Sequence, residues 1–232
     1  MLLRSSRRGL HTLLIANRGE IAQRITRAAA ENEIKTVALK VPGDEAALHV
    51  ASADEAVTVP SYLATSEIVD AAVRSKCDAI HPGYGFLSES AELARMCEDA
   101  GIQFIGPRSE TIALLGDKVA ARALAQSVGV PTAAGTAKPC ADPAAVRDAM
   151  ATEGLLYPIF LKAVGGGGGR GMRIVESDAH LDKIFETCSR EAAVGGNEND
   201  GLFVESMVQS ARHIEVQLLG DGDGNLVHLF ER

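Results

Sequence analysis

The sequence predicts an α/β fold in which a small doubly wound domain is followed by a second α/β domain. Short apolar strands alternate with amphipathic helices from residue 12 onward, which indicates a mostly parallel sheet covered by helices on both faces. Gly116 and Asp117 interrupt that alternation, and a run of glycines between two further strands follows later in the chain. We therefore expect a first domain over residues 13–116 and a second over residues 117–232.

Hydrophobic spacing predicts each element of the first domain in turn. A strand over residues 12–16 leads into a helix over residues 19–33, on which apolar residues recur at helical spacing. Ser66 and Ser88 are each expected to cap a later helix, because a serine hydroxyl accepts a hydrogen bond from the first helical turn. The remaining strands are expected over residues 35–39, 56–59, 78–81 and 102–105.

The second domain is expected to begin with a helix over residues 118–128. Asp142 should cap a helix that starts at Pro143, since proline is well suited to the first helical position. Asp178 should cap a further helix that ends at residue 193. Strands are expected over residues 157–163, 172–175, 202–208, 213–219 and 226–230.

A glycine run lies between the first two of these strands. It consists of Gly165, Gly166, Gly167, Gly168 and Gly169, followed by Arg170 and Gly171. Because glycine has no Cβ, the amide groups of such a loop can approach a phosphate closely, and Lys162 before it could reach the same phosphate. The run is neither a Walker A loop, which needs Lys and Ser or Thr after the last glycine, nor a dinucleotide fingerprint, which a helix follows. A flexible linker can have the same composition, but the neighbouring cations favour phosphate binding.

The composition excludes two classes of function. The formal net charge is −8 and the chain has 6 Phe, 3 Tyr and no Trp, so we expect no basic, base-stacking surface for nucleic acid. No window approaches the roughly 18–20 apolar residues that cross a membrane. The four cysteines form no Cys-x-x-Cys pair, which indicates reduced thiols rather than a zinc site or a disulfide framework.

Residues 1–12 are a candidate targeting segment. Residues 1–19 hold four arginines and no Asp or Glu, a pattern typical of mitochondrial transit peptides. The mitochondrial matrix is therefore one expected location. A short tail before the first strand, in a cytoplasmic protein, is the alternative.

Three weaker motifs remain ambiguous from spacing alone. Residues 81–86, His-Pro-Gly-Tyr-Gly-Phe, end a parallel strand, where open α/β sheets bind ligands, although a rigid Pro-Gly turn would look the same. Residues 221–225 resemble a calcium loop without its final glutamate, so a hairpin turn is favoured. His213, Glu215 and Gln217 would share one face of a strand, lining either a cleft or the solvent.

Six longer motifs follow one another along the chain. They are Leu14-Ile-Ala-Asn-Arg-Gly-Glu-Ile-Ala, Ala79-Ile-His-Pro-Gly-Tyr-Gly-Phe-Leu-Ser-Glu, Phe104-Ile-Gly-Pro, Leu115-Gly-Asp-Lys, Leu161-Lys-Ala-Val-Gly-Gly-Gly-Gly-Gly-Arg-Gly-Met-Arg and Ala211-Arg-His-Ile-Glu-Val-Gln. In order and spacing they resemble biotin carboxylase, the ATP-grasp component of biotin-dependent carboxylases. The resemblance implies a Rossmann-like (pre-ATP-grasp) N-terminal domain followed by an incomplete ATP-grasp domain.

The resemblance also implies a reaction and its partners. MgATP would activate bicarbonate, and the carboxyl group would pass to biotin on a carrier domain. ATP and Mg²⁺ are therefore the implied cofactors, with biotin as a carrier-bound substrate. The implied partners are the biotin carboxyl carrier domain, a carboxyltransferase and, in a homodimer, a second copy of the chain.

Site residues follow from the same resemblance, position by position. Lys118 and Lys162 resemble the lysines that hold ATP phosphates, and residues 165–171 resemble the lid over them. His213 matches a nucleotide-contacting histidine, while Tyr84 and Glu89 would lie on the bicarbonate and biotin side. The adenine hinge would consist of Glu205, Ser206, Met207 and Val208.

The chain departs from the family at some points. The family often has Glu-Lys where this chain has Glu205-Ser206, and residues 40–48 and 133–153 fit the pattern poorly. In the family, metal-binding glutamates and catalytic arginines follow beyond the position of Arg232. The expectation is therefore a chain that binds ATP, with an incomplete Mg²⁺ site and no complete catalytic set. The alternative is a non-catalytic nucleotide-binding or regulatory module.

Overall fold

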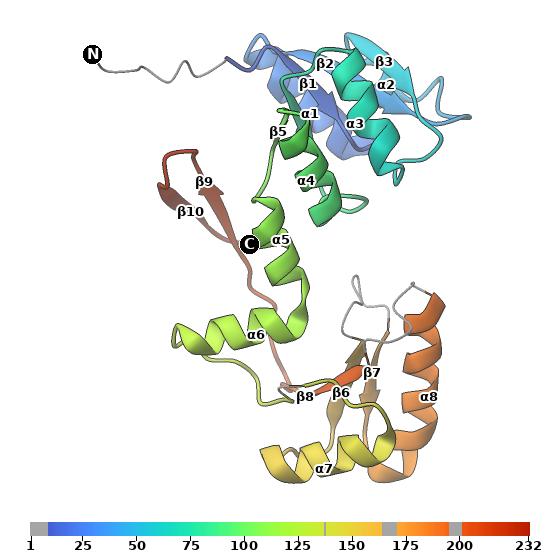
Figure 1. Ribbon diagram of the computed structural model, residues 1–232, viewed down its shortest axis with the longest axis vertical. Coiled ribbons are helices and arrows are strands. Elements are labelled where there is room, and N and C mark those ends of the chain that lie inside the picture. The colour runs from blue at the N-terminus through green and yellow to red at the C-terminus, as the bar shows by residue number, and fades with distance from the viewer. Residues whose placement is uncertain (1–8, 137, 164–170, 195–200) are drawn as a thin grey trace. The chain divides into compact units, whose positions relative to one another are not determined.

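The computed structural model describes residues 9–136, 138–163, 171–194 and 201–232 (Figure 1). The chain divides into two compact units, Met1–Ala121 and Arg122–Arg232. Both units combine helices with sheets, so the predicted α/β class is confirmed.

The first unit is built on a parallel sheet of five strands in the order β3-β2-β1-β4-β5. Its strands are β1 (Thr12–Ile15), β2 (Lys35–Lys40), β3 (Glu55–Thr58), β4 (Ala79–His81) and β5 (Gln103–Phe104). Its helices are α1 (Gly19–Glu31), α2 (Leu48–Ala51), α3 (Thr65–Arg74), α4 (Ala91–Asp99) and α5 (Ser109–Gly116).

Alternate residues of β1 show how helices cover both faces of this sheet. Leu13 and Ile15 pack with Ile25 of α1 in one buried cluster. Leu14 packs on the other side with Ile68 of α3 and residues of α4. Successive strand residues point to opposite faces, so both faces are buried as the sequence predicts.

Several details of the first unit differ from the prediction. Helix α3 follows Ala64, so Ser66 lies within its first turn and does not cap it. Helix α4 is capped by Ser90, whose hydroxyl accepts a hydrogen bond from the Leu93 N–H at 3.1 Å, so the prediction of Ser88 is wrong. Helices α2 and α5 were not expected.

The second unit contains a three-stranded antiparallel sheet in the order β7-β6-β8. The sheet consists of β6 (Ile159–Ala163), β7 (Met172–Val175) and β8 (Leu202–Ser206). Two further strands of the unit, β9 (Val216–Gly220) and β10 (Leu226–Glu231), form a separate antiparallel hairpin. Its helices are α7 (Pro143–Glu153) and α8 (Asp178–Val194), and helix α6 (Lys118–Ser127) spans the division between the units.

Strand β6 alternates between a buried and a half-buried face. Ile159, Leu161 and Ala163 are buried in a cluster with residues of α7 and α8, whereas Phe160 and Lys162 lie on the other face. Lys162 is thereby held at a sheet surface rather than in the core. The predicted Asp142 cap of α7 is confirmed, because its carboxylate accepts a hydrogen bond from the Ala145 N–H at 2.8 Å.

The hairpin of β9 and β10 corrects one prediction and agrees with another. Strand β9 begins at Val216, so His213 lies before it, whereas Glu215 extends the pairing of the hairpin by exchanging two backbone hydrogen bonds with Arg232. Asp221 accepts hydrogen bonds from the backbone N–H groups of Asp223 and Asn225, each at 2.9 Å, which is the turn that the sequence favoured over a calcium loop.

The described residues also bear on membrane-spanning helices and on the state of the cysteines. None of the helices in the described ranges is both long and apolar enough to span a bilayer. All four cysteines are free and buried, in keeping with the expected reduced thiols.

Asp54 gives the first unit a predicted acid sensitivity. Its carboxylate accepts hydrogen bonds from the Thr36 N–H at 2.8 Å and hydroxyl at 2.9 Å, and these bonds lower the pKa of Asp54 below its ordinary value of 3.8. A lowered folded-state pKa stabilises the protein above pH 3.8, and this stabilisation is lost as the pH falls through the folded pKa. Asp54→Asn should therefore cost roughly 0.5–1 kcal/mol at pH 7, since the carboxylate is exposed, and less at pH 3, below the ordinary pKa of 3.8. Urea unfolding at both pH values measures the difference; an equal cost at both would contradict the prediction.

Candidate functional site

The register of β6 against β8 brings two predicted site residues together. Lys162 lies opposite Phe203 and Phe160 lies opposite Glu205, so the four side chains share one face of the sheet. The Lys162 ammonium forms an ion pair with the Glu205 carboxylate. It also lies over the rings of Phe160 and Phe203, 5.2 and 5.8 Å from their centroids. Lys162 is therefore a cation fixed by aromatic and carboxylate neighbours at the end of β6.

A second cation approaches the same carboxylate. Arg122, from α6, places Nη1 3.6 Å from Glu205 Oε1. The side chain of Arg122 is 12% exposed, and those of Lys162 and Glu205 are each 21% exposed. Sequence reasoning missed Arg122, because a single arginine on a short amphipathic helix gives no local signal of its contact.

The predicted hinge begins with the last two residues of β8, Glu205 and Ser206. The strand ends at Ser206, and Met207 and Val208 continue in irregular backbone. One edge of β8 pairs with β6, and on the other the Thr136 N–H donates to the Val204 oxygen at 2.9 Å. The Ser206 N–H donates to the Ala134 oxygen at 2.7 Å. Both edges hold the backbone that leads into the hinge.

Only the end of the glycine run can be placed. Gly165, Gly166, Gly167, Gly168 and Gly169 lie outside the described residues. Gly171 adopts a φ of +66°, and its oxygen accepts a hydrogen bond from the Ala163 N–H at 2.8 Å. A Cβ on Gly171 would lie 2.9 Å from the Ala163 Cβ. The base of the loop is thus closed tightly, beside the strand end that holds Lys162.

Lys118 and His213 are the other predicted nucleotide residues within the described ranges. Lys118 is the first residue of α6, in the first unit. His213 is 85% exposed, with its Nε2 3.8 Å from Glu215 Oε2. Within the second unit, the structure joins Lys162 to Glu205 but does not add His213 to that cluster.

A second candidate region surrounds the loop after β4. The side-chain amide of Asn17, a buried residue, donates to the backbone oxygens of Pro82 at 2.7 Å and Tyr84 at 2.8 Å. The Gly83 N–H donates to His81 Nδ1 at 3.0 Å, and burial lowers the pKa of His81. These contacts fix the loop where β1 and β4 end, the edge at which open parallel sheets bind ligands.

The two predicted residues of this loop differ in their contacts. The Tyr84 hydroxyl donates a hydrogen bond to the Glu20 carboxylate, which raises the pKa of Tyr84. Glu89 is exposed, and the structure does not bring it to Tyr84 or Glu20 by a hydrogen bond.

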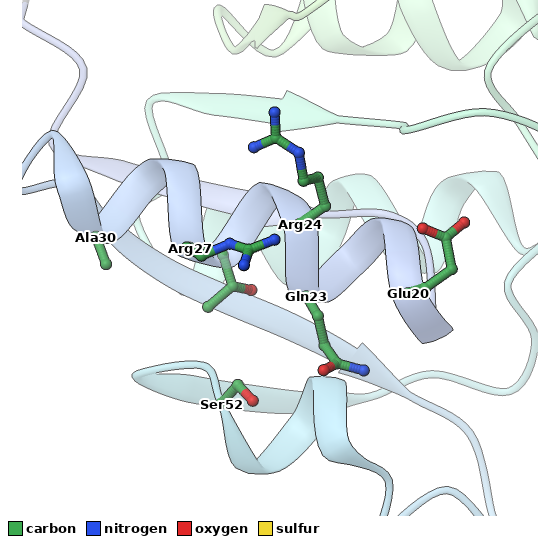
Figure 2. Close-up of a pocket in the computed structure, with 7 residues that line it drawn as sticks. Glu20, Gln23, Arg24, Arg27, Ala30 and Ser52 are labelled. Atoms are coloured by element: carbon green, nitrogen blue, oxygen red, sulfur yellow. The ribbon is translucent and has the colours of Figure 1, made fainter.

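A hollow of about 530 Å³ lies on the outer side of α1 (Figure 2). Figure 2 shows Gln23 extending toward Ser52, while Arg24 projects from another side of the helix. Glu20 lines this hollow and also holds Tyr84, so it joins the hollow to the loop after β4.

Over the described ranges, the structure contains no group of three or more His, Cys, Asp or Glu residues that could hold a metal ion. The described residues therefore offer cations for phosphate but no ready-made cluster of three metal ligands.

Comparison with known families matches the two parts of the chain separately. Residues 9–112 match "Biotin carboxylase, N-terminal domain", and residues 117–232 match "Carbamoyl-phosphate synthase L chain, ATP binding domain". The chain belongs to the biotin carboxylase family. Its fold is the N-terminal domain of that family followed by the ATP-grasp part.

Individual relatives agree with this assignment. The chain is 46% identical to pyruvate carboxylase of Bacillus subtilis over 98% of its own length and 20% of that protein. It is 44% identical to human mitochondrial pyruvate carboxylase over 95% of its length and 19% of that protein.

A solved structure agrees as well. The biotin carboxylase domain dimer of Hydrogenobacter thermophilus 2-oxoglutarate carboxylase, in complex with MgADP, ADP and bicarbonate, matches with a TM-score of 0.90 at 40% identity. The match covers 97% of this chain and 50% of that one. This biotin carboxylase family member therefore spans half or less of these relatives.

Proposed function

We propose that this chain is the ATP-binding part of a biotin carboxylase. The whole enzyme would use MgATP and bicarbonate to carboxylate biotin on a carrier domain. The observation that supports this most directly is the pairing of Lys162 with Glu205 between the closed base of the glycine loop and the start of the hinge. A cation, loop amides and a nearby extended backbone are what a nucleoside triphosphate requires.

Each residue has a proposed task. Lys162, together with Lys118, holds nucleotide phosphates, and residues 165–171 cover them. The backbone of Glu205, Ser206, Met207 and Val208 reads the adenine, and His213 contacts the nucleotide after a movement of its exposed segment. Tyr84 and Glu89 lie on the bicarbonate and biotin side. No step is assigned to Mg²⁺, because the described residues contain no cluster of three metal ligands.

The two proposed domains have different roles. Residues 13–116 would form the N-terminal domain and residues 117–232 the nucleotide-binding domain. The partners would be a biotin carboxyl carrier domain, a carboxyltransferase and a second copy of this chain, since the solved relative is a dimer. A mitochondrial relative and the arginine-rich start support the mitochondrial matrix as the location.

A thermal unfolding titration tests nucleotide binding. At ATP concentrations about 100 times Kd, binding should stabilise the fold by about 2.7 kcal/mol, or roughly 5–10 °C in Tm. Adenosine and tripolyphosphate, used as separate probes for the hinge and the phosphate site, should each stabilise it less. The absence of any ATP-dependent shift would contradict the proposed function.

We further propose that these 232 residues alone bind ATP without completing turnover. An assay of inorganic phosphate released by the purified chain tests this proposal. With ATP, bicarbonate and biotin present, we expect no phosphate release above the buffer control. Sustained release that depends on bicarbonate would contradict this proposal while leaving ATP binding intact.

A further inference from the structure

Glu205 is shared unequally between two cations. Its Oε2 is paired with the Lys162 ammonium, while its Oε1 lies 3.6 Å from Arg122 Nη1. A charge-assisted hydrogen bond between nitrogen and oxygen usually spans about 2.7–2.9 Å, so the contact with Arg122 is an ion pair without a hydrogen bond. The carboxylate therefore neutralises Lys162 first.

Arg122 contains a buried hydrogen-bond donor that is unsatisfied. Its Nη1 is inaccessible to solvent and has no hydrogen-bond partner, although it lies 3.6 Å from Glu205 Oε1. A buried donor without an acceptor is costly, and a carboxylate is the acceptor that a guanidinium fits best. A small movement of Glu205 toward Arg122 would remove this cost.

Nucleotide binding supplies a reason for that movement. Glu205 is paired with the cation that the proposed function gives to a phosphate. A phosphate would compete with Glu205 for the charge of Lys162, and a carboxylate that stays beside a phosphate would repel it. Arg122 can accept the released carboxylate and neutralise it within the same cluster.

We propose that Arg122 is a positioning residue. When Lys162 binds a nucleotide phosphate, the Glu205 carboxylate shifts from Lys162 to Arg122 and pairs with the guanidinium. The proposal rests on the proposed nucleotide-binding function and adds a residue to it. It requires no new contact between Arg122 and the nucleotide. The effect of Arg122 should therefore depend on Glu205 and on the presence of phosphate in the ligand.

The test measures ATP and adenosine affinities of four proteins by isothermal calorimetry: wild type, R122M, E205Q and R122M/E205Q. R122M should weaken ATP binding roughly tenfold or more, because Glu205 then stays on Lys162. Adenosine has no phosphate, so its affinity should change by less than about threefold. In the E205Q background, removal of Arg122 should cost ATP affinity less than about threefold, because no carboxylate remains to be transferred.

R190M is the matched control. Arg190 is an exposed arginine of the same unit whose partner is Glu186, so its replacement removes the same charge without touching the cluster. It should leave the affinity for ATP within about twofold of wild type.

The other outcomes overturn the proposal. Equal losses for ATP and adenosine indicate a merely structural role, and equal losses with and without Glu205 indicate that Arg122 acts on the nucleotide directly. If R122M does not fold, R122K answers the same question, because the shorter point charge should still lower ATP affinity more than adenosine affinity. Unchanged ATP affinity in R122M defeats only the Arg122 proposal, whereas a wild type that binds neither ligand defeats the proposed function as well.

Discussion

Replacing Lys162 with methionine should remove most of the ATP-dependent stabilisation of the chain. The side chain is held at the end of β6 by Glu205 and by two aromatic rings, beside the closed base of the glycine loop. Methionine keeps much of the contact with the rings but supplies no charge for a phosphate. A charge-assisted hydrogen bond contributes about 1.5–3 kcal/mol, so Kd for ATP should rise at least about tenfold.

A thermal titration measures this loss at one ATP concentration. Where wild type gains about 2.7 kcal/mol at 100 times Kd, a tenfold weaker variant gains about 1.4 kcal/mol and a hundredfold weaker one about 0.4 kcal/mol. Lys183→Met is the control, because Lys183 is an exposed lysine of α8 and its replacement removes the same charge. An ATP-dependent shift in Lys162→Met equal to that of Lys183→Met would contradict the assignment of Lys162.

Most of the fold could be predicted because its signals are local. The apolar run of β6 is visible in the sequence, and the Asp142-Pro143 pair marks the start of α7. The unexpected helices depend on distant contacts. Helix α5 is anchored by Ser109, whose hydroxyl donates to Glu98 at 2.7 Å, eleven residues away.

Most residues of the candidate site could be predicted from the sequence, but the contacts between them could not. Lys162 and Glu205 were both selected by resemblance, but their pairing depends on the register of β6 with β8, across 43 positions of sequence. Arg122 approaches Glu205 from a helix that carries no motif at that position. His213 was expected on a strand, yet β9 begins only at Val216, because no pairing partner for residue 213 exists among the described strands.

Gly135→Ala should destabilise the second unit by about 2–3 kcal/mol. Gly135 bridges to Glu205 along the edge of β8 that β6 does not occupy. A Cβ at this position would lie 2.5 Å from the Val204 oxygen and 3.2 Å from the Glu205 Cα. Both are backbone atoms that cannot rotate aside, so the strand or the segment must shift, and such overpacking costs energy of this order.

The shift should reach the nucleotide site. Hydrogen bonds on either side of Gly135 join Thr136 to Val204 and Ala134 to Ser206, and they would lengthen as the segment moves away. Because Ser206 belongs to the proposed hinge, ATP affinity should fall together with stability, whereas Lys162→Met should lower ATP affinity with a smaller loss of stability. Gly222→Ala is the control, since a Cβ there meets nothing within 4 Å. Urea unfolding without nucleotide measures the cost, and a Gly135→Ala protein as stable as Gly222→Ala would mean that the segment is not held against β8 as closely as the structure has it.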